Sequence, residues 1–493
     1  MYTEMAVTPC LTVIALLLTM IVIKLVIRRI VGPVQNQRPV PPVVSWVYMM
    51  SALPTLLTKG QQVVIQDMHT KLGSVFTLSF FGVKKVTFLV GPEVTAHFYQ
   101  APESEISIDN LYEFTVPIFG KGVLYDVDLA TRSRQIRFCT DAIQPMKLKN
   151  HVDSLVHEVQ DYFSNWGEEG TIDLKQEIGN MLMLIAGRCL LGVDIRGKML
   201  VEVSTLLHDI DHNGLHLFSF FFPYLPIPSH QQRDKARTKL GQMFGNIVRL
   251  RKNSGRIGVD VLQNFIDSQY KDEYSMSDDE ITGLLIALLF GGHHSSSNTA
   301  TWTGACLLSH EKYCVAAIEE QKKVMGKYGD HIDYKILSEM GTLHFCIKEA
   351  LRMHATSSLL IRHAKKSFCV QTREGATYEI PEGHTLASST VVSNNLSYIY
   401  KDPHIYDPYR FSEGREEDKV GGKFSYTSFS GGRHACLGEH FAYMQVKVIW
   451  SYLLRNFELK LISPFPEDEW EKFIPGPRGK VMVSYKRRHI VST

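Results

Sequence analysis

The 493-residue sequence contains no CxxC pair and no cysteine spacing typical of a disulfide framework. Its eight cysteines are scattered, which is usual for a protein of a reducing compartment such as the cytosol. The sequence also lacks an excess of charge of one sign, since 53 Lys and Arg oppose 51 Asp and Glu for a net charge of +2. This balance gives no support to nucleic-acid binding.

Internal repeats and low-complexity segments are also missing. Hydrophobic residues make up 44% of the chain and charged residues 21%, which is an ordinary globular composition. A proline-rich connector at residues 31–44 is not followed by a second linker. Length alone would suggest two or three domains, but the missing linker favours one large catalytic domain over residues 45–493.

Charge is absent from residues 5–23, an apolar run that would span about 28 Å as a helix, close to the thickness of a bilayer core. Lys24, Arg28 and Arg29 follow this run and favour the cytosolic side of the membrane. A cleaved signal peptide would carry its positive charge before the run. We therefore expect residues 1–30 to form a single transmembrane helix in the endoplasmic reticulum membrane, with the catalytic domain in the cytosol.

The hydrophobic periodicity predicts a mainly α fold with a minor β region. Ser277 and Glu280 form a capping box that starts a long helix, which we expect to continue to about His310 and to be buried over much of its length. Other predicted helices are Val152–Trp166, Gln231–Lys252, Tyr313–Tyr328, Leu343–His354 and Glu439–Phe457. The predicted strands are Ser74–Phe81 and Lys85–Val90, which would form a hairpin around Gly82, together with Tyr378–Ile380 and Val481–Tyr485.

The segment from Phe429 to Gly438 reads FSGGRHACLG and places Cys436 in a glycine-rich bend just before a predicted helix. Glycines let backbone N–H groups approach the sulfur, and the helix N-terminus stabilises a thiolate. A buried structural cysteine is the alternative. A thiolate below a porphyrin iron would instead favour O–O bond cleavage.

This segment resembles the haem-binding signature of the cytochrome P450 family, and its Arg433-His434 order is similar to that of the sterol 14α-demethylases. Stretches at residues 71–77, 222–228 and 463–488 are similar to the plant members of that branch. The resemblance runs from about residue 40 to the end and implies a cytochrome P450 fold, with Cys436 as the axial ligand of haem b iron. It also implies cofactor-binding roles for Phe429, Gly432, Gly438, Arg433, Tyr112, Tyr125 and Arg362, and for Arg132 or Arg137.

Two further motifs gain a meaning from the resemblance. Glu349 and Arg352 are three residues apart on a predicted helix and would form a buried network with Arg410 that supports the haem loop. His294 and Ser295 align with the histidine and threonine that deliver protons to bound O2, whereas His293 is expected to point elsewhere. Glycine and hydroxyl residues there can also open a kink in the helix. At the positions where the family has alanine and threonine, this sequence has Gly291 and Ser295.

The resemblance also predicts an apolar substrate chamber, lined by Phe114, Phe119, Ala287, Phe290, Gly291, Leu359, Ile361 and Phe473. The residues could equally be plain core packing. An apolar segment, Leu217–Pro228, would dip into the membrane as the substrate entry. The chain departs from the family at residues 355–362, where Ala-Thr-Ser-Ser-Leu-Leu-Ile-Arg stands in place of two prolines and an apolar stretch before the arginine, so that two prolines are lost and three hydroxyls appear.

These departures cluster at the pocket while the residues of oxygen chemistry remain, which favours a changed substrate. We expect a monooxygenase that hydroxylates or epoxidises an amyrin-type pentacyclic triterpene, with 14α-demethylation of obtusifoliol or a related plant sterol as the alternative. Electrons would come from NADPH-cytochrome P450 reductase, docked near Lys419–Lys423 and Arg433. A haem-dependent isomerase or dehydratase, or a non-catalytic lipid binder, is disfavoured by the retained His294-Ser295 pair.

Overall fold

The computed structural model describes residues 39–80, 84–144, 147, 149–192, 198–215, 219–220, 222–255, 258, 260–269 and 275–488. The predicted anchor at residues 1–30 lies outside the described residues, as do residues 31–38 of the connector. Within the described ranges, no helix is long and apolar enough to cross a membrane.

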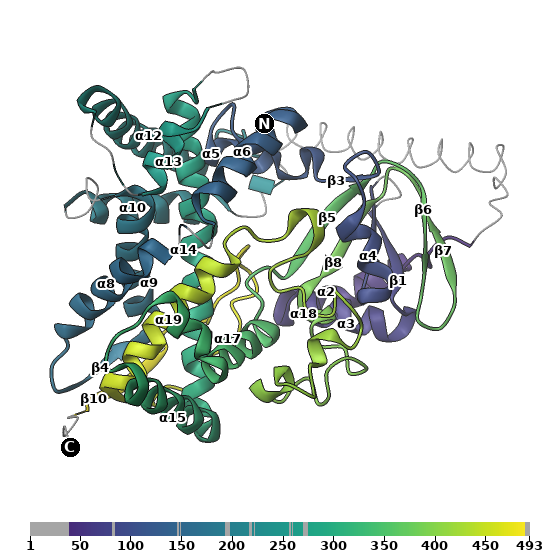
Figure 1. The fold of residues 1–493 in the computed structure, drawn as a ribbon. Helices are drawn as coiled ribbons and strands as arrows, with labels where there is room; N and C mark the ends of the chain where they lie inside the picture. Colours follow the sequence, from purple (N-terminus) through teal and green to yellow (C-terminus); the bar gives the residue numbers. More distant parts are fainter. Residues whose placement is uncertain are drawn as a thin grey trace, which may run out of the picture.

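Helices dominate one side of the molecule, and the largest sheet lies on the other, with α14 (Asp278–Ser309) running through the helical side (Figure 1). This arrangement confirms the predicted mainly α fold with a minor β region. The helical side contains α6 (Leu129–Ala142), α8 (Val152–Ser164), α9 (Leu174–Ala186), α10 (Lys198–Gly214), α12 (Pro228–Ser254), α13 (Val261–Asp267), α15 (Glu311–Tyr328), α16 (Tyr334–Glu339), α17 (Gly341–Met353) and α19 (Glu439–Asn456). The short helix α5 (Val116–Phe119) also lies on the helical side, against α12 and α14, whereas α2 (Trp46–Lys59), α3 (Gln61–Leu72), α4 (Pro92–Gln100) and α18 (Thr390–Ser393) lie near the largest sheet.

The long helix α14 starts as the sequence predicts. The Ser277 hydroxyl accepts from the Glu280 backbone N–H, and the Glu280 carboxylate accepts from the Ser277 N–H at 2.9 Å. Its apolar residues are buried around the whole circumference rather than along one stripe, because α9, α12, α17 and α19 all pack against it. This central position lets α14 form a wall of an internal site.

A five-stranded sheet has the strand order β1-β2-β8-β5-β3. The predicted hairpin is confirmed, because β1 (Val75–Phe80) pairs antiparallel with β2 (Lys84–Leu89); its turn at residues 81–83 lies outside the described residues. The remaining strands of this sheet are β3 (Ile106–Ser107), β5 (Leu359–Ala364) and β8 (Thr385–Ser389). Strand β8 runs parallel to β2 and antiparallel to β5.

Two smaller sheets complete the β structure. The predicted strand near the C-terminus is confirmed as β10 (Met482–Arg487), which lies between β4 (Glu169–Asp173) and β9 (Phe457–Leu461). The strand predicted at Tyr378–Ile380 is confirmed as β7 (Thr377–Ile380), paired with β6 (Phe368–Gln371). The largest buried hydrophobic cluster lies among the helices and includes both Trp302 and Trp450.

Candidate active site

A cavity of about 410 Å³ lies between α14 and the loop that precedes α19. This volume is in the range of small-molecule sites. Its apolar wall consists of Ile143, Leu182, Ala186, Leu190, Ala287, Leu288, Leu360, Phe429, Leu437, Phe441, Ala442 and Ile474. Its polar and glycine wall consists of Gly291, Gly292, His293, Ser295, Ser296, Thr299, Thr356, Ser357, Ser428, Ser430, His434, Cys436, Gly438 and Gln445.

Cys436 sits in the loop that forms one side of this cavity. Its backbone N–H donates to the Phe429 carbonyl at 2.9 Å, which closes the bend, and its side chain is exposed towards the cavity. Burial, together with the Glu439 carboxylate, raises the pKa of the Cys436 thiol, although hydrogen bonds from the backbone N–H groups of Gly438 and Glu439 act in the opposite direction. Because α19 begins at Glu439, its positive helix end also faces the sulfur. The site is therefore built to hold a thiolate once a cation balances the charge.

Gly432 allows the same loop to close against α4. It has a φ of +63°, and a Cβ at this position would lie 1.9 Å from the Tyr99 carbonyl oxygen. Only glycine fits this combination of backbone conformation and close approach. Gly432 does not line the cavity, so the structure places it as a residue that shapes the loop.

The wall opposite Cys436 is the middle of α14. The helix is continuous from Asp278 to Ser309, and the Ser295 hydroxyl donates to the Gly291 carbonyl at 2.6 Å. A Cβ added at Gly291 or Gly292 would meet nothing within 4 Å. The glycines therefore leave open space beside the helix without breaking it.

The two adjacent histidines of α14 have different surroundings. His293 lines the cavity, contrary to our expectation, and its Nε2 lies 3.1 Å from the Gly179 carbonyl oxygen. Burial, with the neighbouring His294, lowers the pKa of His293 to about 4, so its ring is neutral. His294 Nε2 lies 3.8 Å from Asp211 Oδ2 on α10. Burial lowers the pKa of His294 too, but the Asp211 carboxylate opposes this shift. His294 does not line the cavity, but of the two histidines it is the one with a carboxylate beside it.

A group of two buried arginines and two partly buried tyrosines lies beside the Cys436 loop. Arg132 on α6 and Arg362 on β5 are both buried, and Arg362 lies over the Phe98 ring at 5.1 Å. The rings of Tyr112 and Tyr125 stack at 5.1 Å. Burial raises the pKa of Tyr125 to about 12, so its hydroxyl stays protonated and can donate. The sequence analysis gave either Arg132 or Arg137 as a partner of the haem carboxylates. Arg137 is exposed and lies near Asp141, whereas Arg132 is buried.

These features fit a haem group. The cavity offers a sulfur supported by two backbone donors on one side and an open glycine face on the other. Arg132 and Arg362 supply buried positive charge that suits carboxylates, and buried charges need such partners. Arg433 is exposed and does not line the cavity, whereas His434 does.

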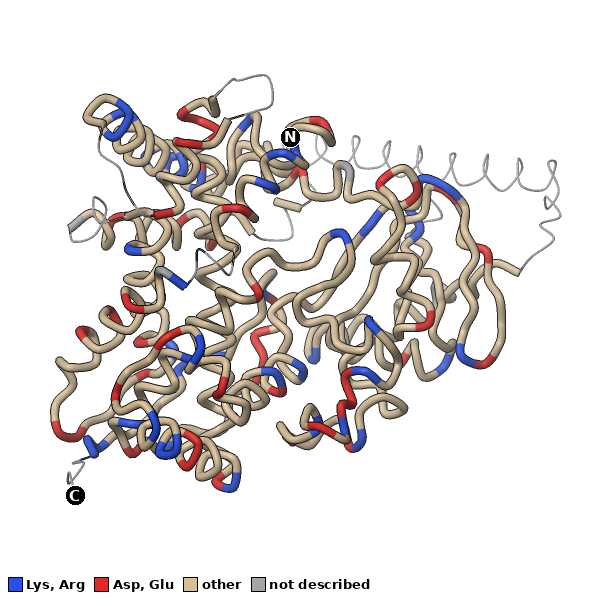
Figure 2. Tube along the Cα trace, viewed as in Figure 1, with Lys and Arg blue, Asp and Glu red and all other residues tan. Residues whose placement is uncertain are grey.

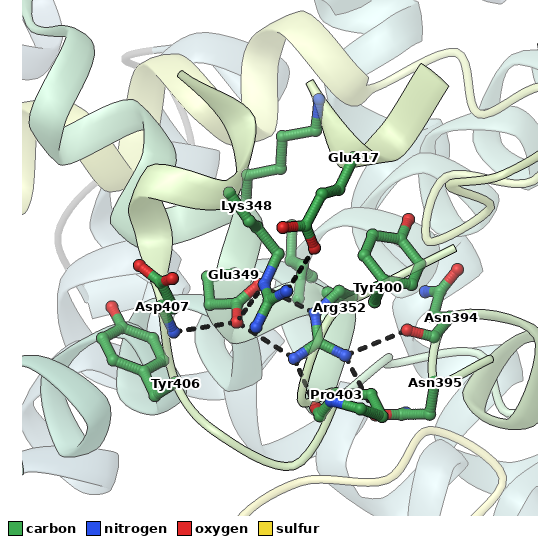
Figure 3. Close-up of polar contacts among 12 residues, drawn as sticks. Lys348, Glu349, Arg352, Asn394, Asn395, Tyr400, Pro403, Tyr406, Asp407 and Glu417 are labelled. Atoms are coloured by element: carbon green, nitrogen blue, oxygen red, sulfur yellow. Dashed lines mark hydrogen bonds and ion pairs between the residues drawn. The ribbon is translucent and has the colours of Figure 1, made fainter. Parts of the chain in front are cut away.

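Glu349, Arg352 and Arg410 meet in one buried cluster, shown in Figure 3. Arg352 donates to both Glu349 oxygens at 2.8 and 3.0 Å, and Arg410 Nε donates to Glu349 Oε1 at 2.9 Å. The Asp407 backbone N–H also donates to Glu349. All three charged side chains are buried, so each depends on the others for its charge partner.

The cluster reaches the cysteine loop through Asn394. Arg352 donates to the Asn394 carbonyl at 3.0 Å, the Asn394 side chain donates to the Ser428 hydroxyl at 2.8 Å, and the Thr427 N–H donates back to the Asn394 side chain. Thr427 and Ser428 directly precede Phe429, where the cysteine loop begins. The position of the loop is thus tied to the buried ion cluster.

The aromatic residues expected in the substrate chamber contact one another. Phe114 packs against Phe473 at 5.6 Å, and Phe119 packs against Phe290 at 5.9 Å. Phe473 is half exposed, whereas the other three are buried. Among the expected chamber residues, Ala287 and Gly291 are the ones that line the cavity. The aromatic residues lie outside its lining, next to Tyr112 and Tyr125.

Strand geometry explains which leucine reaches the cavity. Side chains alternate between the two faces of β5, and the cavity is lined by Leu360 rather than by Leu359 or Ile361. Leu359 and Ile361 pack against the separate core cluster that contains Phe76 and Phe88. Ile474, next to the expected Phe473, also lines the cavity, although it lies outside any strand. The sequence analysis missed Leu360 because it did not assign β5 as a strand.

Positive and negative residues are interspersed along much of the described trace in Figure 2, although α12 carries mainly basic residues. Lys419 and Arg433, expected to meet a reductase, are both exposed, as is Lys423. Lys419 forms an ion pair with Glu416 three residues before it. The local charge is therefore mixed.

Comparison with known proteins extends over nearly the whole chain. The family model described as Cytochrome P450 matches residues 39–483. A protein of Arabidopsis thaliana named sterol 14-demethylase is 50% identical over 472 residues, which is 96% of each chain. A protein of Sorghum bicolor named obtusifoliol 14-alpha demethylase is 50% identical over 456 residues, which is 92% of each chain. The Bos taurus protein named lanosterol 14-alpha demethylase is 32% identical over 472 residues, covering 94% of this chain and 91% of that one.

A solved structure has the same fold. Cyanobacterial CYP120A1 with bound retinoic acid superposes with a TM-score of 0.78, covering 92% of this chain and 100% of that chain. Sequence identity is 19%, so this likeness concerns the fold alone. The predicted fold of the catalytic domain is thereby confirmed.

Proposed function

The chain belongs to the cytochrome P450 family of haem-iron monooxygenases, and from this premise we propose that it demethylates obtusifoliol or a related plant sterol at C14. The observation that carries the proposal is the 50% identity to proteins named sterol 14-demethylase and obtusifoliol 14-alpha demethylase, over more than nine-tenths of both chains. These relatives favour the sterol alternative of the sequence analysis over its amyrin-type reading. A sterol is also consistent with the mainly apolar cavity.

The cofactor proposal assigns haem b to the cavity, with Cys436 as the ligand of its iron. When bound, haem iron with a thiolate ligand supplies the activation of O2. The chain would hold the haem carboxylates through Arg132, Arg362 and the Tyr112 and Tyr125 hydroxyls. The N–H groups of Gly438 and Glu439 would donate to the Cys436 sulfur when the positive charge of the iron holds it as a thiolate.

Proton delivery is proposed to run from Asp211 through His294 to Ser295. Asp211 favours a proton on His294, which lies next to it on the side of α14 that faces α10. Ser295 adjoins His294 in sequence and lines the cavity, so its hydroxyl can accept a proton from one side and donate to the other. The Gly291 carbonyl, to which this hydroxyl donates at 2.6 Å, fixes its orientation between turnovers.

Asp211→Asn is expected to lower kcat about tenfold while leaving KM nearly unchanged. Without the carboxylate, the pKa of His294 falls further below its usual value, and each unit of that shift lowers the protonated fraction about tenfold at neutral pH. Activity that needs protonated His294 declines as the pH rises, so this decline should move to lower pH. A pH profile of kcat for wild type and variant measures the shift, with Asp209→Asn on the same helix as the control. An unchanged profile would contradict the relay.

The substrate proposal is tested by absorbance titration of the ferric holoenzyme with obtusifoliol and, separately, with β-amyrin. A ligand that displaces water from the iron changes the spin state and the spectrum, so the shift reports binding near the iron. A low-to-high-spin shift and NADPH-dependent product with obtusifoliol support the sterol proposal. A shift and product with β-amyrin alone would overturn it in favour of the triterpene reading, and product formed without NADPH would favour an isomerase.

One specific observation favours the alternative hypothesis of a triterpene substrate, namely the open space at Gly291. A methyl group there would meet no neighbouring atom within 4 Å, so it would project into free volume beside the cavity. We expect Gly291→Ala to stabilise α14 by about 1 kcal/mol while weakening the binding of a wide pentacyclic ligand about tenfold more than that of obtusifoliol. Parallel spectral titrations measure this ratio. Equal effects on both ligands would show that Gly291 does not select the substrate.

Electron supply and location follow as parts of the same proposal. NADPH-cytochrome P450 reductase would approach the side of the Cys436 loop, near the exposed Lys419, Lys423 and Arg433. Residues 1–30 would anchor the chain in the endoplasmic reticulum membrane. Phe222, Tyr224 and Leu225 are exposed by 58%, 66% and 44%, which supports membrane contact by the part of the Leu217–Pro228 segment that the structure describes.

A further inference from the structure

Glu103 lies at the centre of the cations beside the cysteine loop. It follows α4 and precedes β3, and its side chain is about 10% exposed. The His434 Nε2 donates to Glu103 Oε1 at 2.8 Å, and Arg132 Nη2 lies 3.8 Å from Oε2. One carboxylate therefore joins α6 to the residue two positions before Cys436.

The charges of this cluster keep Glu103 ionised. Burial acts to raise the pKa of the Glu103 carboxyl, but the hydrogen bond from His434 and the positive charges of His434, Arg132 and Arg362 outweigh it and lower the pKa. Two buried arginines thus face one fixed negative charge. A carboxylate-bearing ligand that binds to these arginines must share them with Glu103.

We propose that Glu103 is a positioning residue that holds Arg132 and His434 beside the haem carboxylates. The fixed negative charge of Glu103 also lowers the reduction potential of the iron. The inference rests on the haem assignment and not on the identity of the sterol. Reduction adds an electron to the iron, and a nearby fixed negative charge opposes that step. Glu103 acts through its neighbours and takes no part in bond making.

The backbone around Glu103 does not need the carboxylate for its fold. The N–H groups of Glu105 and Ile106 both donate to the Pro102 carbonyl, at 2.9 and 3.0 Å, and close this turn without side chains. Removing the charge should therefore leave the turn intact. What changes is the orientation of His434 and the electrostatic balance at Arg132.

The test is the reduction potential of full-length, haem-loaded Glu103→Gln, measured by dye-mediated titration. Glutamine keeps an oxygen acceptor for His434 but removes the charge. At a fixed ambient potential the ratio of ferrous to ferric protein should rise about tenfold, which corresponds to about 59 mV for one electron. The matched control is Glu105→Gln, because Glu105 pairs with His97 at 3.4 Å on a more exposed surface and should leave the potential unchanged.

A potential equal to that of the wild type in Glu103→Gln overturns the proposal. If Glu103→Gln retains too little haem for a titration, Glu103→Asp keeps the charge on a shorter side chain. Slower haem release to apomyoglobin from the aspartate variant than from the glutamine variant then supports the proposal. Equal rates of haem release from both variants would show that the charge of Glu103 does not help to hold the haem, and would overturn the proposal.

Discussion

Cys436→Ser is expected to remove the long-wavelength carbon monoxide band of ferrous protein and to reduce NADPH-dependent product formation to background. A serine hydroxyl does not ionise under these conditions, so the two N–H donors from Gly438 and Glu439 would have no anion to stabilise. The electron donation that favours O–O cleavage is lost with the thiolate. Absorbance of the reduced, carbon monoxide-treated protein measures the first effect, and product analysis measures the second.

The matched control is Cys369→Ser on β6, which replaces an exposed cysteine far from the cavity lining. This variant should keep both the band and the activity. Persistence of the band in Cys436→Ser would contradict the assignment of Cys436 as the iron ligand. Loss of fold is excluded by comparing the far-ultraviolet circular dichroism of the two variants.

Glu349→Gln is expected to lower the free energy of unfolding by about 3–5 kcal/mol, because it leaves Arg352 and Arg410 buried without their shared charge partner. Such a loss is a large fraction of a typical domain's stability, so much of the protein should be purified without haem. The Asn394 contacts to Thr427 and Ser428 would transmit the disturbance to the cysteine loop. Urea denaturation and the ratio of haem to protein absorbance measure the two effects.

Arg415→Gln provides the control on the rim of the same network. Arg415 pairs with Asp407 and Glu417 but is 38% exposed, so its loss should cost less than about 1 kcal/mol. Arg352→Lys is the second variant, since lysine keeps the charge but cannot form both bonds to Glu349. If Glu349→Gln and Arg415→Gln cost the same, the buried cluster is not the support of the loop.

Local signals in the sequence predicted the helices well. The capping box at Ser277 and Glu280 places the start of α14, and the two predicted strands on either side of Gly82 correspond to the β1–β2 hairpin. Strand β8 (Thr385–Ser389) was not predicted, because it is buried at every position and shows no alternation. One of its partners, β2, lies about three hundred residues away in the chain. Strand β5 was also not predicted, although its burial alternates.

In the candidate site, too, local signals were predicted from the sequence and groupings of distant residues were not. The glycine-rich loop points to Cys436 because its signal lies within ten residues. The grouping of Glu103, Arg132, Arg362 and His434 draws on four distant segments, and no spacing in the sequence reveals it. Alternate side chains of β5 point to opposite faces, and Leu360 is on the face towards the cavity. Which residues share that face can be stated only once the strand and its position are known.

The packing of Gly432 against Tyr99 sets the order in which the protein can be completed during synthesis. Tyr99, Glu103 and Arg132 leave the ribosome early, whereas Gly432 and Cys436 come within the last seventh of the chain. At about 5–20 residues per second, the early groups wait for tens of seconds before the loop that faces them exists. The proposed haem site is therefore complete only after residue 436 has been translated, and a chain truncated before that residue would lack the proposed thiolate ligand.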